Sequence, residues 1–196
     1  MNHECYVLMD AKSPLEVESR LLPEVLQCLL NHILFHRALG GVVVPKDMVL
    51  LDDLFYVRCD DAKMEKQVRD SSEAAANALK KKEAGGKVTL TFYEKGMWGD
   101  KVPWEEWVMH FVLRTEPSFG HREEMLRRKE LETRVKELMW LVLKIVSVHR
   151  EHLPKVKISD RTAICFPFEI KDPSRREGVL DLLGRAVSGP KVQVPL

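Results

Sequence analysis

The sequence has no excess of charge of either sign and no long apolar run. Its 31 basic and 30 acidic residues give a formal net charge of +1, so it lacks the broad positive field on which non-specific nucleic-acid binding depends. No uninterrupted apolar run approaches the ~18 residues of a membrane-spanning helix, and the first ten residues lack the basic start and apolar stretch of a signal peptide. We therefore expect a cytoplasmic protein with no nucleic-acid partner and no transmembrane segment.

Cysteine, glycine and proline are also sparse. The four cysteines are widely spaced and form no CxxC pair, so we interpret them as reduced core residues. Ten glycines and ten prolines are too few for a disordered or fibrous chain. A chain of this length can bury roughly 70% of its unfolded surface in one core. We expect a single domain over 1–196, with flexible ends at 1–4 and 189–196.

Motifs of nucleotide binding and covalent catalysis are missing. The only Gly-Gly pairs, at 40–41 and 85–86, follow predicted helices instead of opening them, so neither predicts a phosphate-binding loop. No nucleophile has a base at a recognisable spacing. The sequence therefore predicts a protein that is not an enzyme and that needs no cofactor.

Two sets of polar residues leave a rival interpretation open, a small metal-dependent hydrolase. Four histidines have spacings at which they could share a metal, but no carboxylate stands at a metal-motif spacing; they are His32, His36, His149 and His152. Paired acids flank a predicted strand, where acid and base groups can sit, but a turn and a helix N-terminus explain them better; they are Asp52, Asp53, Asp60 and Asp61. We predict no metal site.

Apolar residues recur at helical spacing in some segments and alternate or run together in others. A helix beginning near Leu21 avoids placing Pro23 in its interior, where the proline would cost ~3 kcal/mol. Pro167 cannot donate to a sheet ladder, so its strand should lie at a sheet edge with this position outward. The predicted helices span 21–40, 60–83, 121–152 and 175–187, and the predicted strands span 5–9, 54–59, 87–93, 107–113 and 164–170.

The strands 87–93 and 107–113 form a predicted hairpin around 94–102. The first strand alternates, so we expect it to be covered on one side only, whereas the second is apolar on both faces, as in a central strand. Within 54–59, alternate apolar residues beginning with Phe55 share one side. The polar stretch 10–19 is predicted to be a linker.

The predicted helix 121–152 is apolar on two faces. On the outward face, Lys144 is flanked by Trp140, Leu141 and Val148, which is more typical of a protein interface than of a solvated face. In the alternative, another element of the same chain covers this face. The predicted inward stripe comprises Leu131, Val135, Leu138, Met139, Val142 and Val146.

Trp98 stands in the loop 94–102 with no other aromatic residue beside it. Burying a tryptophan could contribute ~4 to 6 kcal/mol, so an exposed position requires some other use, such as insertion into a partner's pocket. In the alternative, Met97 and Trp98 fold back onto the hairpin.

Several short fragments, taken in order, resemble the autophagy-related protein 101 family over about residues 20–170. Each fragment is weak alone, but the ordered set is fairly specific. The fragments are Phe35-His36-Arg37 with Gly40, Tyr56-Val57-Arg58, Phe92-Tyr93, Pro103-Trp104-Glu105-Glu106-Trp107, Leu153-Pro154 and Phe166-Pro167-Phe168-Glu169-Ile170.

The resemblance implies an α+β protein with the HORMA fold, in which three helices pack on a mainly antiparallel β-sheet and a C-terminal segment completes the edge. It also implies a non-catalytic subunit of the autophagy-initiation kinase complex. Such a subunit pairs with and stabilises the HORMA domain of autophagy-related protein 13, recruits downstream autophagy factors, and is cytoplasmic with recruitment to the preautophagosomal structure. A HORMA adaptor outside autophagy is the alternative.

The resemblance also assigns two sites. By position, Trp98 matches the tryptophan of the family's exposed finger, and Met97 is its apolar companion, because Gly99 and Asp100 stand where the finger's phenylalanine would follow. HORMA proteins commonly dimerise through the exposed side of the last long helix. The predicted dimer interface comprises Trp140, Leu141, Lys144, Val148 and His152.

Overall fold

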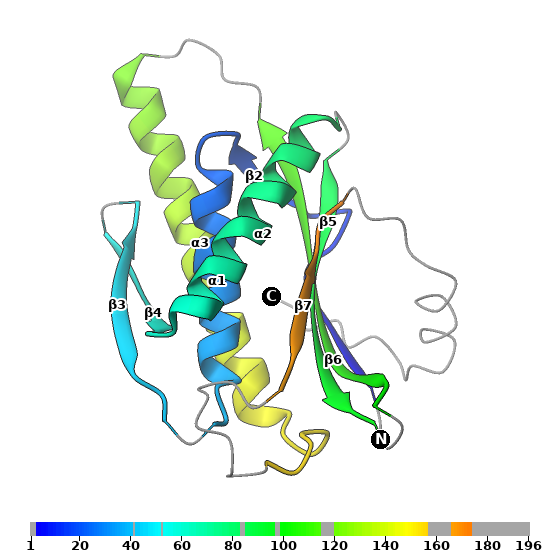
Figure 1. Ribbon diagram of the computed structural model, residues 1–196. Coiled ribbons are helices and arrows are strands. Elements are labelled where there is room, and N and C mark those ends of the chain that lie inside the picture. The colour runs from blue at the N-terminus through cyan, green and yellow to red at the C-terminus, as the bar shows by residue number, and fades with distance from the viewer. Residues whose placement is uncertain are drawn as a thin grey trace.

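The computed structural model of the protein describes residues 3–40, 42–51, 53–82, 85–96, 99–114, 120–156 and 166–173. In this part of the chain, three helices form a layer between a five-stranded sheet and a small two-stranded sheet (Figure 1). Antiparallel pairing predominates, and the fold belongs to the α+β class, as predicted.

The central strand of the larger sheet is β6 (Lys101–Arg114). Its 14 residues are long enough to pair in parallel with two short strands in tandem, β1 (Glu4–Met9) and β2 (Leu15–Glu18). On its other side lies β5 (Gly86–Lys95), which is antiparallel to it and forms the predicted hairpin. β7 (Phe168–Lys171) pairs with β5 and is an edge strand, as predicted.

Three helices pack side by side against this sheet, and α1 lies between the other two (Figure 1). They are α1 (Leu22–His36), α2 (Ala62–Lys80) and α3 (His121–Val148). Pro23 falls in the first turn of α1, where a proline is tolerated. Asp61 caps α2, because its Oδ1 accepts a hydrogen bond from the Met64 N–H at 2.9 Å, the helix N-terminal role predicted for this acid.

The small sheet lies against α1, on the side away from the larger sheet. Its strands, β3 (Pro45–Leu50) and β4 (Leu54–Cys59), form a hairpin that turns through Leu51, a residue with positive φ (53°). Leu54 and Tyr56 are buried, whereas Phe55 is 70% exposed. The strand 54–59 is confirmed, but the side that contains Phe55 faces outward, and β3 was not predicted.

Three further expectations are wrong in detail. β2 lies within the predicted linker 10–19. The second face of β5 is not open, because Thr89 and Thr91 are buried there. α3 ends at Val148, four residues early, because His149 adopts an extended backbone (φ −93°, ψ 96°).

Pro167 is exposed and precedes β7, and its carbonyl accepts a hydrogen bond from the Tyr93 N–H at 2.8 Å. Proline can make this bond because it has a backbone carbonyl that accepts a hydrogen bond and lacks only the backbone N–H. Cys5, Cys28 and Cys59 are buried thiols, as predicted. The predicted helix 175–187, Ile164, Cys165 and the ends 1–2 and 189–196 lie outside the described residues.

Candidate interaction surface on helix α3

Three outward residues of α3 form a single stripe near the C-terminal end of this helix. Trp140 is 72% exposed, Val148 is 69% exposed, and Lys144 between them is also exposed. Residues four apart lie one above the other on a helix, so the three side chains share one line on the surface. We call Trp140, Lys144 and Val148 the outer stripe. Their predicted exposure is confirmed.

A shallow hollow of about 810 Å³ lies along the outer stripe. Arg134 and Glu137 border it and form an ion pair at 2.9 Å. Apolar and charged side chains both line the hollow, as in contact surfaces that combine apolar area with polar groups. Its lining residues are Arg134, Glu137, Trp140, Leu141, Leu143, Lys144 and Ser147.

The expectation that Leu141 is exposed is wrong. Its side chain is only 7% exposed, because Leu141 lies about 100° around the helix from Trp140 and continues the buried row of Leu138, Val142 and Ile145. This row belongs to the core. Leu141 nevertheless lines the hollow, so it lies at the boundary between the core and the surface.

The expectation that His152 lies on the exposed side of α3 is also wrong. Because the helix ends at Val148, the chain turns inward, and the His152 side chain is only 5% exposed. Its Nε2 lies 2.7 Å from Oε2 of Glu105 on β6. His152 therefore fixes the segment after α3 to the sheet.

Glu105 is the centre of a buried polar cluster that the sequence analysis did not identify. The Arg37 guanidinium donates to both carboxylate oxygens, at 2.7 to 3.1 Å, and the Trp107 indole N–H donates to Oε1 at 2.6 Å. Burial acts to raise the pKa of Glu105, but hydrogen bonds from His152 and Arg37, together with the Arg37 charge, outweigh it and hold the pKa below its usual value. The cluster joins the end of α1, β6 and the segment after α3.

A bulge in the hairpin explains why a glutamate is buried here. The register between β5 and β6 shifts so that Phe92 pairs with Glu105 and Tyr93 with Pro103, which leaves Trp104 as an extra residue. Successive strand residues normally point to opposite faces, but a bulge can redirect one of them. Trp104 and Glu105 are both fully buried, and both contact His152.

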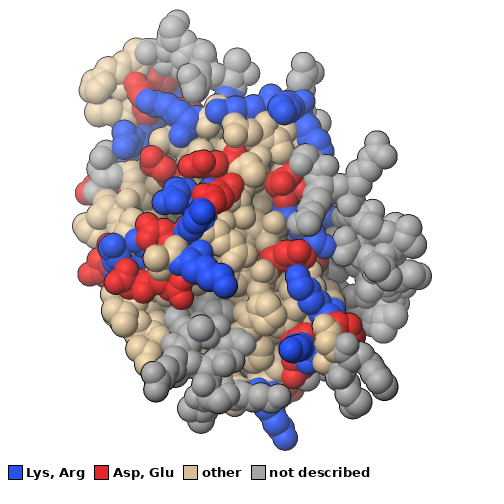
Figure 2. All heavy atoms as spheres, viewed as in Figure 1, with Lys and Arg blue, Asp and Glu red and all other residues tan. Residues whose placement is uncertain are grey.

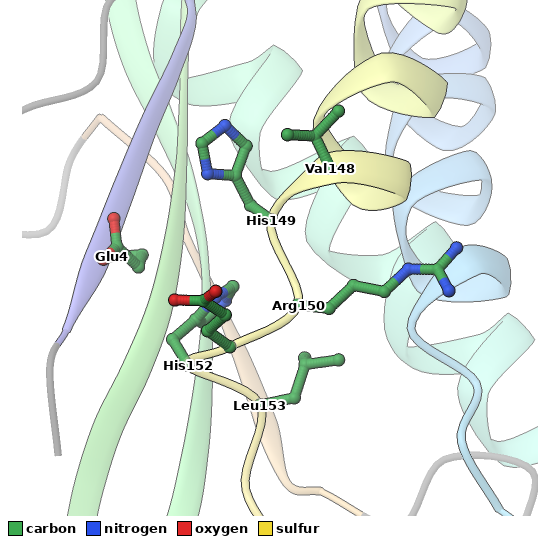
Figure 3. Close-up of a pocket in the computed structure, with 7 residues that line it drawn as sticks. Glu4, Val148, His149, Arg150, His152 and Leu153 are labelled. Atoms are coloured by element: carbon green, nitrogen blue, oxygen red, sulfur yellow. The ribbon is translucent and has the colours of Figure 1, made fainter.

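A second hollow, of about 550 Å³, lies beside the segment that follows α3. In Figure 3, Glu4 on β1 lies across from His149, and Arg150 points away from them. Val148 stands at the edge of this hollow, so the outer stripe reaches the turn after α3. The lining residues are Glu4, Val148, His149, Arg150, Glu151, His152 and Leu153.

The predicted finger residues Met97 and Trp98 lie outside the described residues. The ladder of the hairpin that carries them continues beyond the bulge to the pair Lys95 and Lys101, and the Gly96 N–H donates to the Asp100 carbonyl at 2.8 Å. Gly99 has a φ of 82°, a conformation that favours glycine. The roles of Met97 and Trp98 stay a prediction.

The histidines of the rival metal interpretation have structural partners. The His32 Nε2–H donates to the Met139 carbonyl at 3.1 Å, and burial, with a smaller effect of His36, lowers the pKa of His32 to about 4. His32 and His36 pack edge to face, with ring centroids 4.6 Å apart. Within the described ranges, no group of three or more His, Cys, Asp or Glu residues is placed to hold a metal.

The fold is that of an α+β protein, and α3, the last helix among the described residues, carries an exposed stripe with two large apolar side chains. A protein-family model described as "Autophagy-related protein 101" matches residues 14–160, three quarters of the chain and all of α3. The chain belongs to this family, and its role lies in autophagy.

Two curated relatives bear the same name. The protein from Arabidopsis thaliana is 31% identical over 193 aligned residues, which cover 86% of this chain and 88% of the relative. The protein from Schizosaccharomyces pombe is 26% identical over 181 aligned residues, which cover 88% of this chain and 91% of the relative. No helix among the described residues is long and apolar enough to cross a membrane.

Proposed function

We propose that this protein is a non-catalytic HORMA subunit of the autophagy-initiation kinase complex. In this role it binds and stabilises the HORMA domain of autophagy-related protein 13 through the outer stripe of α3. It is cytoplasmic and is recruited with its partner to the preautophagosomal structure. The family resemblance supplies the partner, and the exposure of the outer stripe supports the surface.

The observation that carries the proposal is the contrast between the two sides of one helix. Most of the apolar residues near the C-terminal end of α3 are buried, yet Trp140 is 72% exposed and Val148 69% exposed. Tryptophan is enriched among the residues that dominate interface energies. The aliphatic part of Lys144 can pack between the two apolar side chains while its ammonium group stays in water. A partner with a matching apolar pocket and a carboxylate would cover all three.

Leu141 and His152 belong to this proposed interface as supports. Leu141 lines the hollow from the side of the core, so its packing sets the depth at which a partner's side chain could bind. His152, held by Glu105, fixes the turn that follows Val148. Substitution of either residue should reduce partner binding through the shape of the surface, along with some loss of stability.

The finger is the second part of the proposal. Trp98, with Met97 beside it, is the expected anchor for downstream autophagy factors, at the tip of the β5–β6 hairpin. The tip lies at the end of a long two-stranded ladder, and loop tips on rigid scaffolds are common binding positions. This surface is separate in sequence from the outer stripe, so each can be tested alone.

The experiment is co-purification of the full chain with the HORMA domain of autophagy-related protein 13. We expect the wild-type chain to form a stable complex and Lys144→Glu to abolish it, because reversal of the charge at the centre of the stripe opposes the partner's carboxylate. Met125→Ala is the matched control, since Met125 is 56% exposed near the other end of the same helix. Equal recovery of the partner by Lys144→Glu and Met125→Ala would reject the proposed interface.

A further inference from the structure

The exposed apolar side chains of the described residues gather in more than one place. Four of the ten large ones lie on or beside the β3–β4 hairpin, and the outer stripe of α3 does not include them. The segment that begins with Val42 and runs into β3 is rich in valine, yet it is mostly exposed. The four residues are Val42, Val44, Val49 and Phe55, and their exposed fractions are 59%, 51%, 53% and 70%.

Val49 and Phe55 form one apolar pair on the outer face of the hairpin. They are register partners on β3 and β4, on the face opposite to the buried Leu50, Leu54 and Tyr56. The Asp60 N–H donates to the Val44 carbonyl at 2.8 Å, and this bond shows which register pairs of the two strands are hydrogen-bonded. Counting along the strands, Val49 and Phe55 form a non-hydrogen-bonded pair, in which Cα atoms approach to about 4.5 Å. Their side chains therefore form a continuous apolar surface.

Because hydrogen-bonded and non-hydrogen-bonded pairs alternate, some backbone groups of β3 point away from β4. The N–H and C=O groups of Asp47 and Val49 point to the outer edge, because their neighbours Lys46 and Met48 make the bonds to β4. Among the described strands, only β4 pairs with β3. Pro45 and Lys46 are residues that discourage edge pairing, but they protect only the first part of the strand. The stretch Asp47–Val49 keeps an open edge.

Carboxylates surround this apolar surface. Asp47, Asp53 and Asp60 are exposed around the hairpin, and Lys46 lies 3.9 Å from Asp60. Figure 2 shows acidic side chains, with some basic ones among them, over the flank where β3, β4 and the start of α2 lie. An acidic rim disfavours anionic partners and attracts basic ones. Edge pairing with a second copy of this chain would bring two acidic rims together, and like charges that face each other are destabilising.

We propose that the β3–β4 hairpin is a docking site for an extended protein segment of alternating aliphatic and basic residues, which adds to β3 as a third strand. The outward N–H and C=O groups of Asp47 and Val49 supply the backbone bonds. Val49 and Phe55 receive the aliphatic side chains, and the acidic rim receives the basic ones. This site is independent of the outer stripe and of the finger.

The test uses an acetylated eight-residue peptide of alternating valine and lysine as the probe, titrated into the full chain by NMR. We expect amide shifts concentrated at 46–50 and 54–57. A peptide in which glutamate replaces each lysine should bind at least about tenfold more weakly. Equal binding of the two peptides, shifts located elsewhere, or no shifts at millimolar peptide would overturn the proposal.

Variants of the outer face separate this site from the rest of the surface. Phe55→Ser and Val49→Ser should each weaken the lysine peptide at least about tenfold with an unchanged melting temperature, because both side chains are exposed. Val148→Ser, a loss of an equally exposed valine on α3, is the matched control and should bind the peptide normally. Equal peptide binding by all three variants would overturn the proposal. Self-association of the free chain would also overturn it if Phe55→Ser removed that self-association.

Phe55→Ser and Val49→Ser should leave co-purification with autophagy-related protein 13 unchanged, whereas Val148→Ser removes part of the outer stripe and should weaken it. Lys144→Glu should conversely leave peptide binding unchanged. Failure of the hairpin site and failure of the proposed heterodimer would therefore appear in different variants.

Discussion

The buried Glu105 cluster and the exposed outer stripe of α3 are opposite exceptions to the usual placement of residues. Glu105 is a carboxylate with no exposed surface, and Trp140 is an aromatic residue with most of its surface in water. The chain itself satisfies Glu105 through Arg37, Trp107 and His152. Nothing in the described part of the chain covers Trp140. The chain itself supplies every partner that the buried carboxylate needs, whereas the exposed Trp140 lies where we propose that another protein binds.

The largest effect expected from this comparison is a decrease in the free energy of unfolding when Glu105 is replaced. Glu105→Gln leaves the Arg37 charge buried without its counter-ion, and loss of one partner of a buried ion pair typically costs about 3 to 5 kcal/mol. Urea denaturation should show this decrease in the free energy of unfolding. Glu137→Gln is the control, because its partner Arg134 is at the surface, and its change should be under about 0.5 kcal/mol. Equal stability of the two variants would contradict the structural role of the cluster.

The next effect is a dependence of stability on pH that arises from His32. Burial lowers the pKa of His32 to about 4 in the folded chain, whereas an unfolded histidine has a pKa near 6.5. As the pH falls from 6.5 to 4, the unfolded chain therefore takes up a proton that the folded chain does not. The free energy of unfolding should fall over this window, by at most about 3 kcal/mol.

Denaturation of the His32→Gln variant between pH 7 and pH 4 checks this cause. The variant should lose the part of the slope between pH 6.5 and 4.5 that His32 causes, and part should remain because burial also lowers the pKa of His36 and His110. It should keep a decline at lower pH, because the pKa of Glu105 is held below its usual value and stability is lost when this carboxylate takes up a proton. An unchanged slope in the variant would assign the effect to another group.

A smaller effect on binding, with almost none on folding, is expected for the outer stripe. Trp140→Ala should weaken the complex with the HORMA domain of autophagy-related protein 13 by about 2 kcal/mol, near thirtyfold. The free energy of unfolding of the free chain should change by less than about 0.5 kcal/mol, because Trp140 is 72% exposed. Calorimetric titration and urea denaturation measure the two quantities. A loss of stability without a loss of affinity would place Trp140 in the core.

The smallest expected effect on the fold is that of Trp98→Ala. We expect an unchanged melting temperature and an unchanged heterodimer, with loss of a downstream autophagy factor from pull-downs of the complex. A melting temperature lower by several degrees would instead indicate that Trp98 packs onto the hairpin.

Periodicity identified the parts of the fold that have a strong pattern. α1, α3, the β5–β6 hairpin and the edge position of β7 follow from apolar spacing and from two prolines. β2 alternates strictly, but its four residues are too few to distinguish it from the polar linker around it. β3 was missed because it begins with Pro45, Lys46 and Asp47 and does not alternate. For β4 the strand was predicted, but the alternation did not reveal which side is buried, since both sides carry large apolar or aromatic residues.

The interaction surface on α3 was also predictable only where the sequence pattern is strong. A helical wheel places Trp140, Lys144 and Val148 outward, but Leu141 lies at the edge of the buried row, where a rotation of a few tens of degrees decides its exposure. The position of His152 depends on where α3 ends, and no proline or glycine marks that end at His149. The burial of Glu105 depends on a bulge, a feature of strand pairing that local sequence does not encode.

The central claim, that α3 is covered by a partner, is tested most directly by hydrogen exchange of the chain alone and with the HORMA domain of autophagy-related protein 13. The account predicts that amide exchange over 138–150 slows when the partner binds, while exchange over 45–59 in the β3–β4 hairpin is unchanged. Slower exchange in the hairpin, together with unchanged exchange over 138–150, would contradict this claim.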